Sequence, residues 1–160
     1  MQLSWVTIEK PDEMNIILGM SHFIRTVEDL HEACAISTPD IRFGVAFCEA
    51  SGDRLVRHSG NDDDLRRLAA KNIQAIGAGH LFLVMMQNAF PIHVLRAVQA
   101  VPEVCRVFCA TGNAVQVVLA ETDQGRGVLG VIDGQPPLGV EDQAQIDERH
   151  QFLRTIGLKL

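Results

Sequence analysis

The chain has 160 residues, a net charge of −6, and 47% hydrophobic against 21% charged residues, a composition typical of one globular domain. No cluster of basic residues occurs, so the chain lacks the basic face that neutralises a nucleic-acid backbone. No stretch approaches the roughly 20 apolar residues of a membrane span, and the N-terminus has no basic signal-peptide start. We therefore expect a cytoplasmic protein with one domain over residues 1–160 and no nucleic-acid or membrane partner.

Apolar periodicity and turn signals predict seven strands and four helices. In chain order these are strands at 3–8 and 15–20, a helix at 27–36, a strand at 41–50, a helix from the N-cap Asn61 to Ile76, a strand at 80–87, a helix at 91–101, strands at 104–110, 114–121 and 128–132, and a helix at 143–156. Thr111-Gly112-Asn113 has the chemistry of a hairpin turn, so we expect the strands on either side of it to pair.

The alternation of strands and helices in the middle of the chain predicts an α/β fold, with a mixed β-sheet and helices packed on its faces; an α+β fold is the alternative. The strands at 41–50 and 80–87 are apolar almost throughout. Such strands are buried on both sides in folded proteins, so both faces of the sheet should be covered.

Polar residues follow several of the predicted strands, as in Glu49, Asn88 with Ala89, Asn113 and Glu121. In open α/β sheets, ligands bind at the carboxyl ends of strands, and these residues are candidates for a site there. Strands also end in turns, and turns are polar, so this alternative stays open at each position.

His80 follows Gly77-Ala78-Gly79, which lets the backbone leave a helix tightly before the strand at 80–87. A histidine held there could act as a nucleophile or a proton carrier, and a half-buried structural imidazole is the alternative.

Two arginines are candidates for contacts with phosphate. Arg126 stands between Gly125 and Gly127, whose backbone amides could assist, and Arg57 precedes Asn61 and Asp62. Neither lies in a Rossmann or P-loop motif. A surface side chain in a turn is the alternative for each.

No metal site is predicted. Asp62-Asp63-Asp64 is more typical of a helix start than of a Mg²⁺ site, and no zinc-type spacing occurs among the histidines and cysteines. The four cysteines are expected to be buried, reduced thiols.

The chain also resembles the adenosine-specific kinase family over nearly its whole length. The resemblance is carried by the strings SHFIRTVEDLHEA, FGVAFCEASG, LVRHSGNDDDL, IGAGHLF, NAFPIHVL, VPEVCRVFCATGN, AETDQGRGVLGVIDG and PLGVE. It implies an oligomeric α/β protein that binds adenosine or adenine nucleotides and transfers phosphoryl groups through a phosphorylated histidine.

His80 is the position that matches this histidine. The family strings that would line the site contain Asn61, Asp62, Asp63, Asn88, Ala89, Asn113, Glu121, Gly125, Arg126 and Gly127. His58, His93 and Arg96 depart from the residues expected in the family, which leaves His58 and His93 as alternatives to His80.

The function that these features imply is an adenine-nucleotide-binding phosphotransferase with ATP as donor and Mg²⁺ expected beside it. His80 would receive the phosphoryl group, Glu49 or Glu121 would orient its imidazole, and Arg57 or Arg126 would neutralise phosphate oxygens. A non-catalytic adenosine or AMP sensor and a purely structural oligomer are the alternatives. Self-association as a trimer, or a multiple of one, is expected.

Overall fold

The structure, a computed structural model, describes all residues from 1 to 160 and contains eight strands and four helices. The strands are β1 (Gln2–Thr7), β2 (Asn15–Ser21), β3 (Arg42–Cys48), β4 (Val56–Gly60), β5 (Leu81–Gln87), β6 (Val104–Thr111), β7 (Val115–Thr122) and β8 (Gly125–Asp133). The helices are α1 (Thr26–Ala35), α2 (Asp63–Ile76), α3 (Pro91–Ala100) and α4 (Gln143–Thr155). The predicted fold class is confirmed, because strands and helices alternate along the chain and helices cover a sheet.

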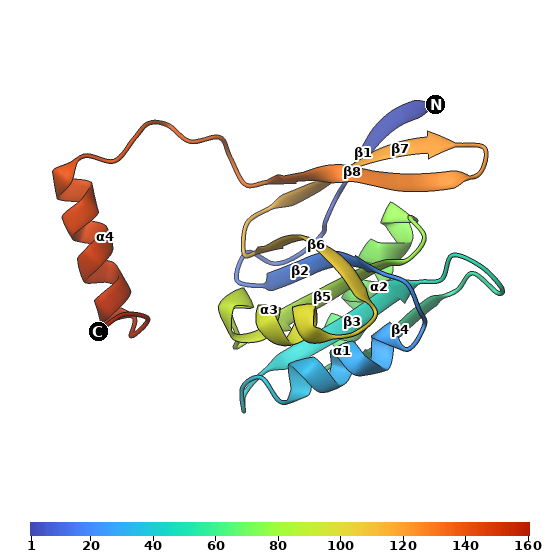
Figure 1. Cartoon of the computed structure of the whole chain (residues 1–160), viewed down its shortest axis with the longest axis horizontal. Helices are drawn as coiled ribbons and strands as arrows, with labels where there is room; N and C mark the ends of the chain where they lie inside the picture. Colours follow the sequence, from blue (N-terminus) through green and yellow to red (C-terminus); the bar gives the residue numbers. More distant parts are fainter.

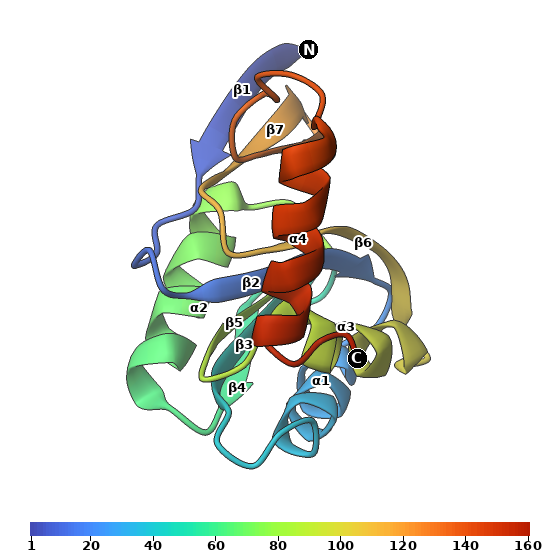
Figure 2. The ribbon, with the colours of Figure 1, turned by 90° about the vertical axis from the view of Figure 1, so that its left-hand side faces the viewer.

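The centre of the molecule is an antiparallel five-stranded sheet in the order β4-β3-β5-β2-β6. Helix α2 lies on one side of this sheet, and α1 and α3 lie on the other (Figure 2). Successive residues of β5 enter opposite cores: Leu83 and Met85 pack toward α2, whereas Phe82 and Val84 pack toward α1 and α3. The expectation that the apolar strands are covered on both faces is therefore confirmed.

A second, three-stranded sheet in the order β1-β7-β8 stacks above the first on the α2 side (Figure 1). Val115, Val117 and Leu119 of β7 point inward and belong to the same core cluster as Ile73 of α2. Val6 of β1 and Val128 and Val131 of β8 pack against the same cluster. Because side chains alternate along a strand, the residues between these inward positions face away from the core.

Three local predictions were wrong. The strands on either side of Thr111-Gly112-Asn113 do not pair: β6 pairs with β2, and β7 pairs with β1 and β8, so this turn passes from one sheet to the other. Strand β4 was not predicted. The N-cap of α2 is Asp62, which accepts hydrogen bonds from the backbone of Asp64 and Leu65, whereas Asn61 bonds the backbone of β3.

The cysteines are all free, and Cys105 is exposed whereas the other three are buried. Their spacing would place Cys105 and Cys109 on one face of a regular strand, but two register shifts interrupt the pairing of β6 with β2, and the two differ in burial.

Helix α4 departs from the expectation that the helices pack on the sheet. It stands apart from the rest of the molecule at the end of an extended segment (Figure 1), and none of its residues is buried. None of the four helices combines the length and the apolar character that crossing a membrane would require.

Gly44 sets the distance between β3 and α2. A Cβ at this position would lie 2.3 Å from the carbonyl carbon of Leu65 and 2.4 Å from the backbone nitrogen of Arg66. Both atoms belong to helix backbone, which cannot move aside as a flexible side chain can. The close contact of α2 with the central sheet therefore requires glycine here.

We predict that Gly44→Ala lowers the free energy of unfolding by at least about 1–3 kcal/mol, because the helix must shift to admit the methyl group. Gly130→Ala is the matched control, since a Cβ there meets nothing within 4 Å. Chemical denaturation of both variants measures the difference, and equal midpoints would contradict the close-approach argument.

Candidate functional site

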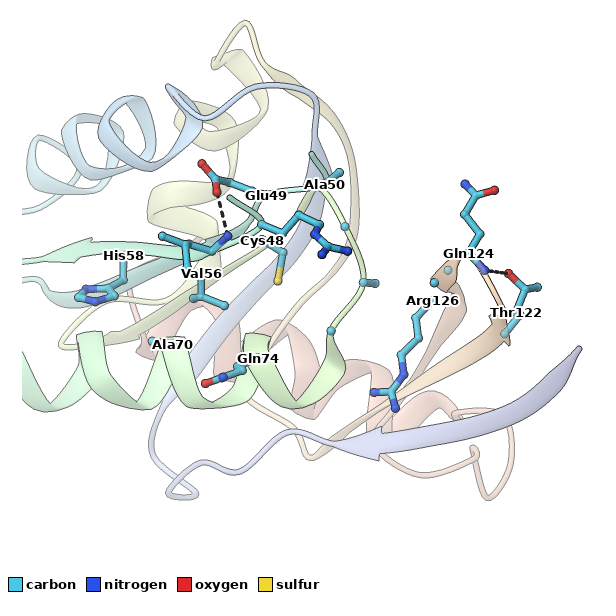
Figure 3. A pocket seen from close by; sticks show the side chains of 18 residues that line it. Cys48, Glu49, Ala50, Val56, His58, Ala70, Gln74, Thr122, Gln124 and Arg126 are labelled. Carbon is cyan, nitrogen blue, oxygen red and sulfur yellow. Dashed lines mark hydrogen bonds between the residues drawn. The ribbon is translucent and has the colours of Figure 1, made fainter. Parts of the chain in front are cut away.

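An open cleft of about 1030 Å³ lies at one end of the molecule. Its walls are the β3–β4 hairpin, the C-terminal half of α2 and the tip of the β7–β8 hairpin (Figure 3). Cys48, Val56, Ala70 and Gln74 face the space between the hairpin and the helix, and Gln124 comes from the second sheet. Pockets for small ligands typically enclose about 300–1,000 Å³, so a nucleoside or nucleotide would fit.

The cleft exists because α2 ends abruptly. Gly77 adopts a left-handed conformation with φ of 64° and closes the helix through a hydrogen bond to Ile73. The next residue, Ala78, pairs with Arg126 in a short parallel bridge between the second sheet and the chain that leads into β5. The end of the helix and the two sheets thus meet around one hollow.

Two ion pairs each contribute one predicted site residue, Glu49 or Arg126, to the lining of the cleft. Glu49 accepts hydrogen bonds from the Leu55 backbone at 2.8 Å and from Arg57 at 3.0 Å. These bonds, the backbone one foremost, hold the pKa of Glu49 below its ordinary value, so it is ionised at neutral pH. Arg126 bonds Glu121 at 3.2 Å and donates to the carbonyls of Ala75 and Ile76 at the end of α2.

Arg54 is the arginine of the cleft that forms no ion pair or hydrogen bond through its side chain. It lies in the β3–β4 loop and has a positive φ of 52°, which is uncommon for a residue other than glycine. Strained backbone of this kind often accompanies binding sites. Arg54 is therefore the cation that the cleft can offer to an anionic ligand.

His80 directly follows Gly79, which lines the cleft, but its ring lies elsewhere. The imidazole stacks on Phe47 with ring centres 5.9 Å apart, and Phe47 belongs to the core on the α1 and α3 side. The backbone of His80 is held at both ends, by Cys48 O at 2.8 Å and Ser21 N at 2.9 Å. Its φ of 61° is also left-handed. Neither ring nitrogen of His80 forms a hydrogen bond within the chain.

The remaining predicted residues lie at the opposite end of the central sheet. Asp62 forms an ion pair with Arg42, Asn113 donates to Asp133 at 3.0 Å, and Asn88 and Ala89 end β5 beside Asn15. Strands β3 and β5 are antiparallel, with Arg42 opposite Gln87 and Phe47 opposite Phe82. Their carboxyl ends therefore point in opposite directions, and the structure does not bring the predicted residues into one site.

Several residues that line the cleft were not singled out from the sequence. They are Arg54, Gln74, Thr122 and Gln124. The Ser51-Gly52 turn signal before a further strand could have indicated a hairpin loop, but β4 itself was missed. Gln74 follows Ala70 by one helical turn and lies on the same face of α2, a relation that is visible only once the helix is known to border a cleft.

Comparisons with known proteins identify the family. The family model described as adenosine specific kinase matches residues 6–159. The chain belongs to this family. No curated protein matched the chain. Among solved structures, the crystal structure of the PH1918 protein from Pyrococcus horikoshii OT3 is similar, with 41% identity and a TM-score of 0.95, covering 99% of this chain and 98% of that one.

Kinases of many families use Mg²⁺ together with ATP. A cleft that binds ATP in this member of the adenosine specific kinase family should therefore offer ligands for Mg²⁺. Mg²⁺ is bound by one or two carboxylates together with substrate phosphates. Glu49 is the carboxylate that lines the cleft, and its two oxygens are engaged by Leu55 and Arg57. No group of three or more acidic, histidine or cysteine side chains is arranged to hold a metal. The residues of the cleft do not fit a preformed Mg²⁺ site.

The thiol of Cys48 also borders the cleft, but it is only weakly nucleophilic. Burial raises the pKa of Cys48 to about 11, so the group is a neutral thiol at physiological pH. A neutral thiol is a poor nucleophile, and Cys48 serves as part of the apolar wall.

Two neighbouring carboxyls, the half-buried Asp29 and the buried Glu103, share Arg25 as an ion-pair partner. Glu103 is 1% exposed, pairs with Arg25 through one oxygen and has no hydrogen-bond donor at the other. Burial, and then the neighbouring Glu103, raise the pKa of Asp29. Burial alone would raise the pKa of Glu103 as well, but hydrogen bonds led by that from Arg25 lower it. The two carboxyls thus differ: the pKa of Asp29 is raised and that of Glu103 is lowered.

We predict that Asp29→Asn raises the melting temperature relative to the wild type more at about pH 7 than at about pH 4. A raised folded-state pKa means that the contribution of Asp29 to stability is complete at low pH and is lost as pH rises through that pKa. Asparagine carries no charge at any pH and avoids this loss. Glu28→Gln, an exposed carboxylate in the same turn, is the control, and a pH-independent difference for Asp29→Asn would contradict the raised pKa of Asp29.

Proposed function

We propose that this chain is an adenine-nucleotide-binding phosphotransferase whose cleft holds the nucleotide. The observation that carries the proposal is the match to the adenosine specific kinase family over residues 6–159 together with an open cleft of suitable volume. The apolar wall formed by Val56, Ala70 and Ala78 suits the face of a purine, and Gln74 and Gln124 supply amide groups for its edge.

Arg54 would bind the phosphate of the nucleotide. The other two arginines named as candidates, Arg57 and Arg126, are already paired with Glu49 and Glu121. An arginine free of such pairs can form charge-assisted bonds to phosphate oxygens without first losing a partner. Arg57 and Arg126 would instead shape the rim of the cleft.

His80 would receive the phosphoryl group. A ring-nitrogen lone pair attacks the γ-phosphorus of ATP, the bond from that phosphorus to the bridging oxygen breaks, and ADP leaves with the electron pair. A hydroxyl oxygen of adenosine then attacks the phosphorus and releases its proton to solvent, while the nitrogen–phosphorus bond breaks and its electron pair returns to the imidazole. Of the three histidines considered, His58 and His93 have Nδ1 within hydrogen-bond distance of a donor, of Arg66 at 3.2 Å and of the Phe90 backbone at 3.1 Å.

The alternative is a non-catalytic adenosine or AMP sensor. One observation favours it: the ring of His80 lies against Phe47, whereas the cleft opens on the α2 side of the sheet. A γ-phosphoryl group would have to reach the sheet edge at Gly79 for transfer. Self-association, as a trimer or a multiple of one, belongs to this proposal as well.

Adenosine should raise the melting temperature more than guanosine does, because a ligand that binds only the folded state stabilises it, by about 2.7 kcal/mol at 100 times its Kd. Gln74→Trp, which fills the cleft from α2, should abolish the shift. Lys71→Trp, on the same helix but outside the cleft, should keep it. Equal shifts with adenosine and guanosine would show that the cleft is not adenine-specific.

Arg54→Ala should lose most of the additional stabilisation that AMP gives over adenosine, because the variant lacks the proposed phosphate contact. Thermal shift with both ligands measures this difference. Arg67→Ala, an exposed arginine on α2 outside the cleft, is the control. A variant that keeps the full preference for AMP would remove Arg54 from the site.

Incubation with γ-labelled ATP should leave acid-labile, alkali-stable label on the wild type and on His58→Ala and His93→Ala, but not on His80→Ala. The reason is that His80 alone among these three keeps both ring nitrogens free. Label that persists in His80→Ala would show that another residue is the acceptor. An unlabelled wild type that still responds to adenosine would favour the sensor.

A further inference from the structure

His58 lines the cleft between β4 and α2, and Arg66 holds its ring from the helix. Val56 and His58 are two residues apart on β4, so they lie on the same face, roughly 7 Å from each other. Arg66 and Ala70 are one turn apart on α2, a rise of roughly 6 Å. Figure 3 shows His58 beyond Val56 along the strand, with Ala70 on the helix below them. Val56 and Ala70 thus form an apolar pair in the cleft, next to a polar pair of His58 and Arg66.

Arg66 fixes the position of the proton on His58. Its NH1 lies 3.2 Å from Nδ1 of His58, and a guanidinium can only donate hydrogen bonds. Nδ1 is therefore the acceptor, and in a neutral imidazole the proton is then on Nε2. Asp63 holds Arg66 in place, because its carboxylate accepts a hydrogen bond from NH2 at 2.8 Å. Nε2–H of His58 forms no hydrogen bond within the chain, so it is an uncharged donor that a ligand can use.

The arginine that is free to bind phosphate lies at the other end of the β3–β4 hairpin. Arg54 precedes β4 and shares its loop with Ala50. Ala50 packs against Gly79, where an added Cβ would lie 2.9 Å from the Ala50 side chain. Arg54 and Gly79 therefore share one end of the cleft, and His58 lies at the opposite end.

A nucleotide fits this order of groups in one direction. With its phosphate on Arg54 and its base between the apolar pair, the edge of the base farthest from the ribose points toward His58. In adenine that edge carries the exocyclic amino group and N1, which accepts a hydrogen bond. In guanine and hypoxanthine N1 carries a hydrogen and donates instead. The reverse direction would place the phosphate beside Arg66, whose charge Asp63 already balances.

We propose that Nε2–H of His58 donates a hydrogen bond to N1 of the bound base, so that the cleft accepts 6-aminopurine nucleosides and rejects 6-oxopurine nucleosides. This inference rests on the proposed function of the cleft. Against a 6-oxopurine the donor of His58 meets a second donor at N1, and both lose their hydrogen bonds to water without a replacement. Arg66 and Asp63 are positioning residues, because they act on the base only through the ring of His58.

Titration calorimetry with nucleoside analogues tests the contact. 1-Deazaadenosine has a C–H group in place of N1 and should bind the wild type roughly threefold to tenfold more weakly than adenosine, the effect of one hydrogen bond. 7-Deazaadenosine keeps N1 and should bind like adenosine, whereas inosine should bind more weakly. In His58→Ala, adenosine and 1-deazaadenosine should bind alike. His58→Gln, whose side-chain amide also donates, should restore the difference between them.

The tautomer of His58 is a second readout, which a merely structural role of Arg66 would not change. Nitrogen-15 spectra of the free full-length protein, at a pH where the imidazole is neutral, should place the proton on Nε2. Arg66→Met should give a mixture of both tautomers and weaken the preference for adenosine over 1-deazaadenosine. Arg67→Met is the matched control, since Arg67 is also an arginine of α2 paired with an aspartate, and it should keep both properties.

The outcomes separate this inference from the proposed function. The inference alone is overturned if the wild type binds adenosine and 1-deazaadenosine equally, if 7-deazaadenosine shows the greater loss, or if the proton of His58 lies on Nδ1. A wild type that binds neither adenosine nor AMP would overturn the proposed function, and the inference with it.

Discussion

The fold depends on the burial of β3 and β5 on both faces. Each contributes alternate side chains to two separate cores, with Phe47 and Phe82 on the α1 and α3 side and Ala46 and Leu83 on the α2 side. A strand covered on both faces can neither shift its register nor lose a helix without exposing apolar surface. The edge of the central sheet where β3 ends and β5 begins is therefore rigid. The candidate cleft and the backbone of His80 both lie at this edge.

The second sheet is tied to this edge by Arg126. Its guanidinium reaches the carbonyls of Ala75 and Ile76, where the negative end of the α2 dipole lies, and it also pairs with Glu121. A cation that is used in this way fixes one wall of the cleft against another. Its N–H donors are already engaged within the chain, so an arginine flanked by glycines can be structural. Arg54, on a loop without such partners, is the better candidate for binding phosphate.

Sequence reasoning was most reliable where burial dictates the pattern. The apolar runs of β3 and β5 were recognised because a doubly covered strand has no polar side. Strand β4 was missed because it reads Val-Arg-His-Ser-Gly, and an edge strand that pairs with β3 alone needs no apolar run. The Thr111-Gly112-Asn113 turn was misread because local turn chemistry does not say to which sheet the following strand belongs. The predicted site was split for a related reason: the rule on carboxyl ends holds for parallel strands, and these are antiparallel.

Two of the three strained backbone positions outside glycine, Arg54 and His80, lie where the function is proposed, and the third, Asn88, lies at the opposite end of the central sheet. The residues other than glycine with positive φ are Arg54, His80 and Asn88. Each such conformation costs on the order of 1–3 kcal/mol and persists only when its surroundings fix it. At His80 they do so through hydrogen bonds from its N–H to Cys48 and to its carbonyl from Ser21, both on strands of the central sheet. The sheet thereby holds this residue in a single backbone conformation while its ring nitrogens stay free, and an imidazole positioned in this way loses little further entropy when it meets a phosphoryl group.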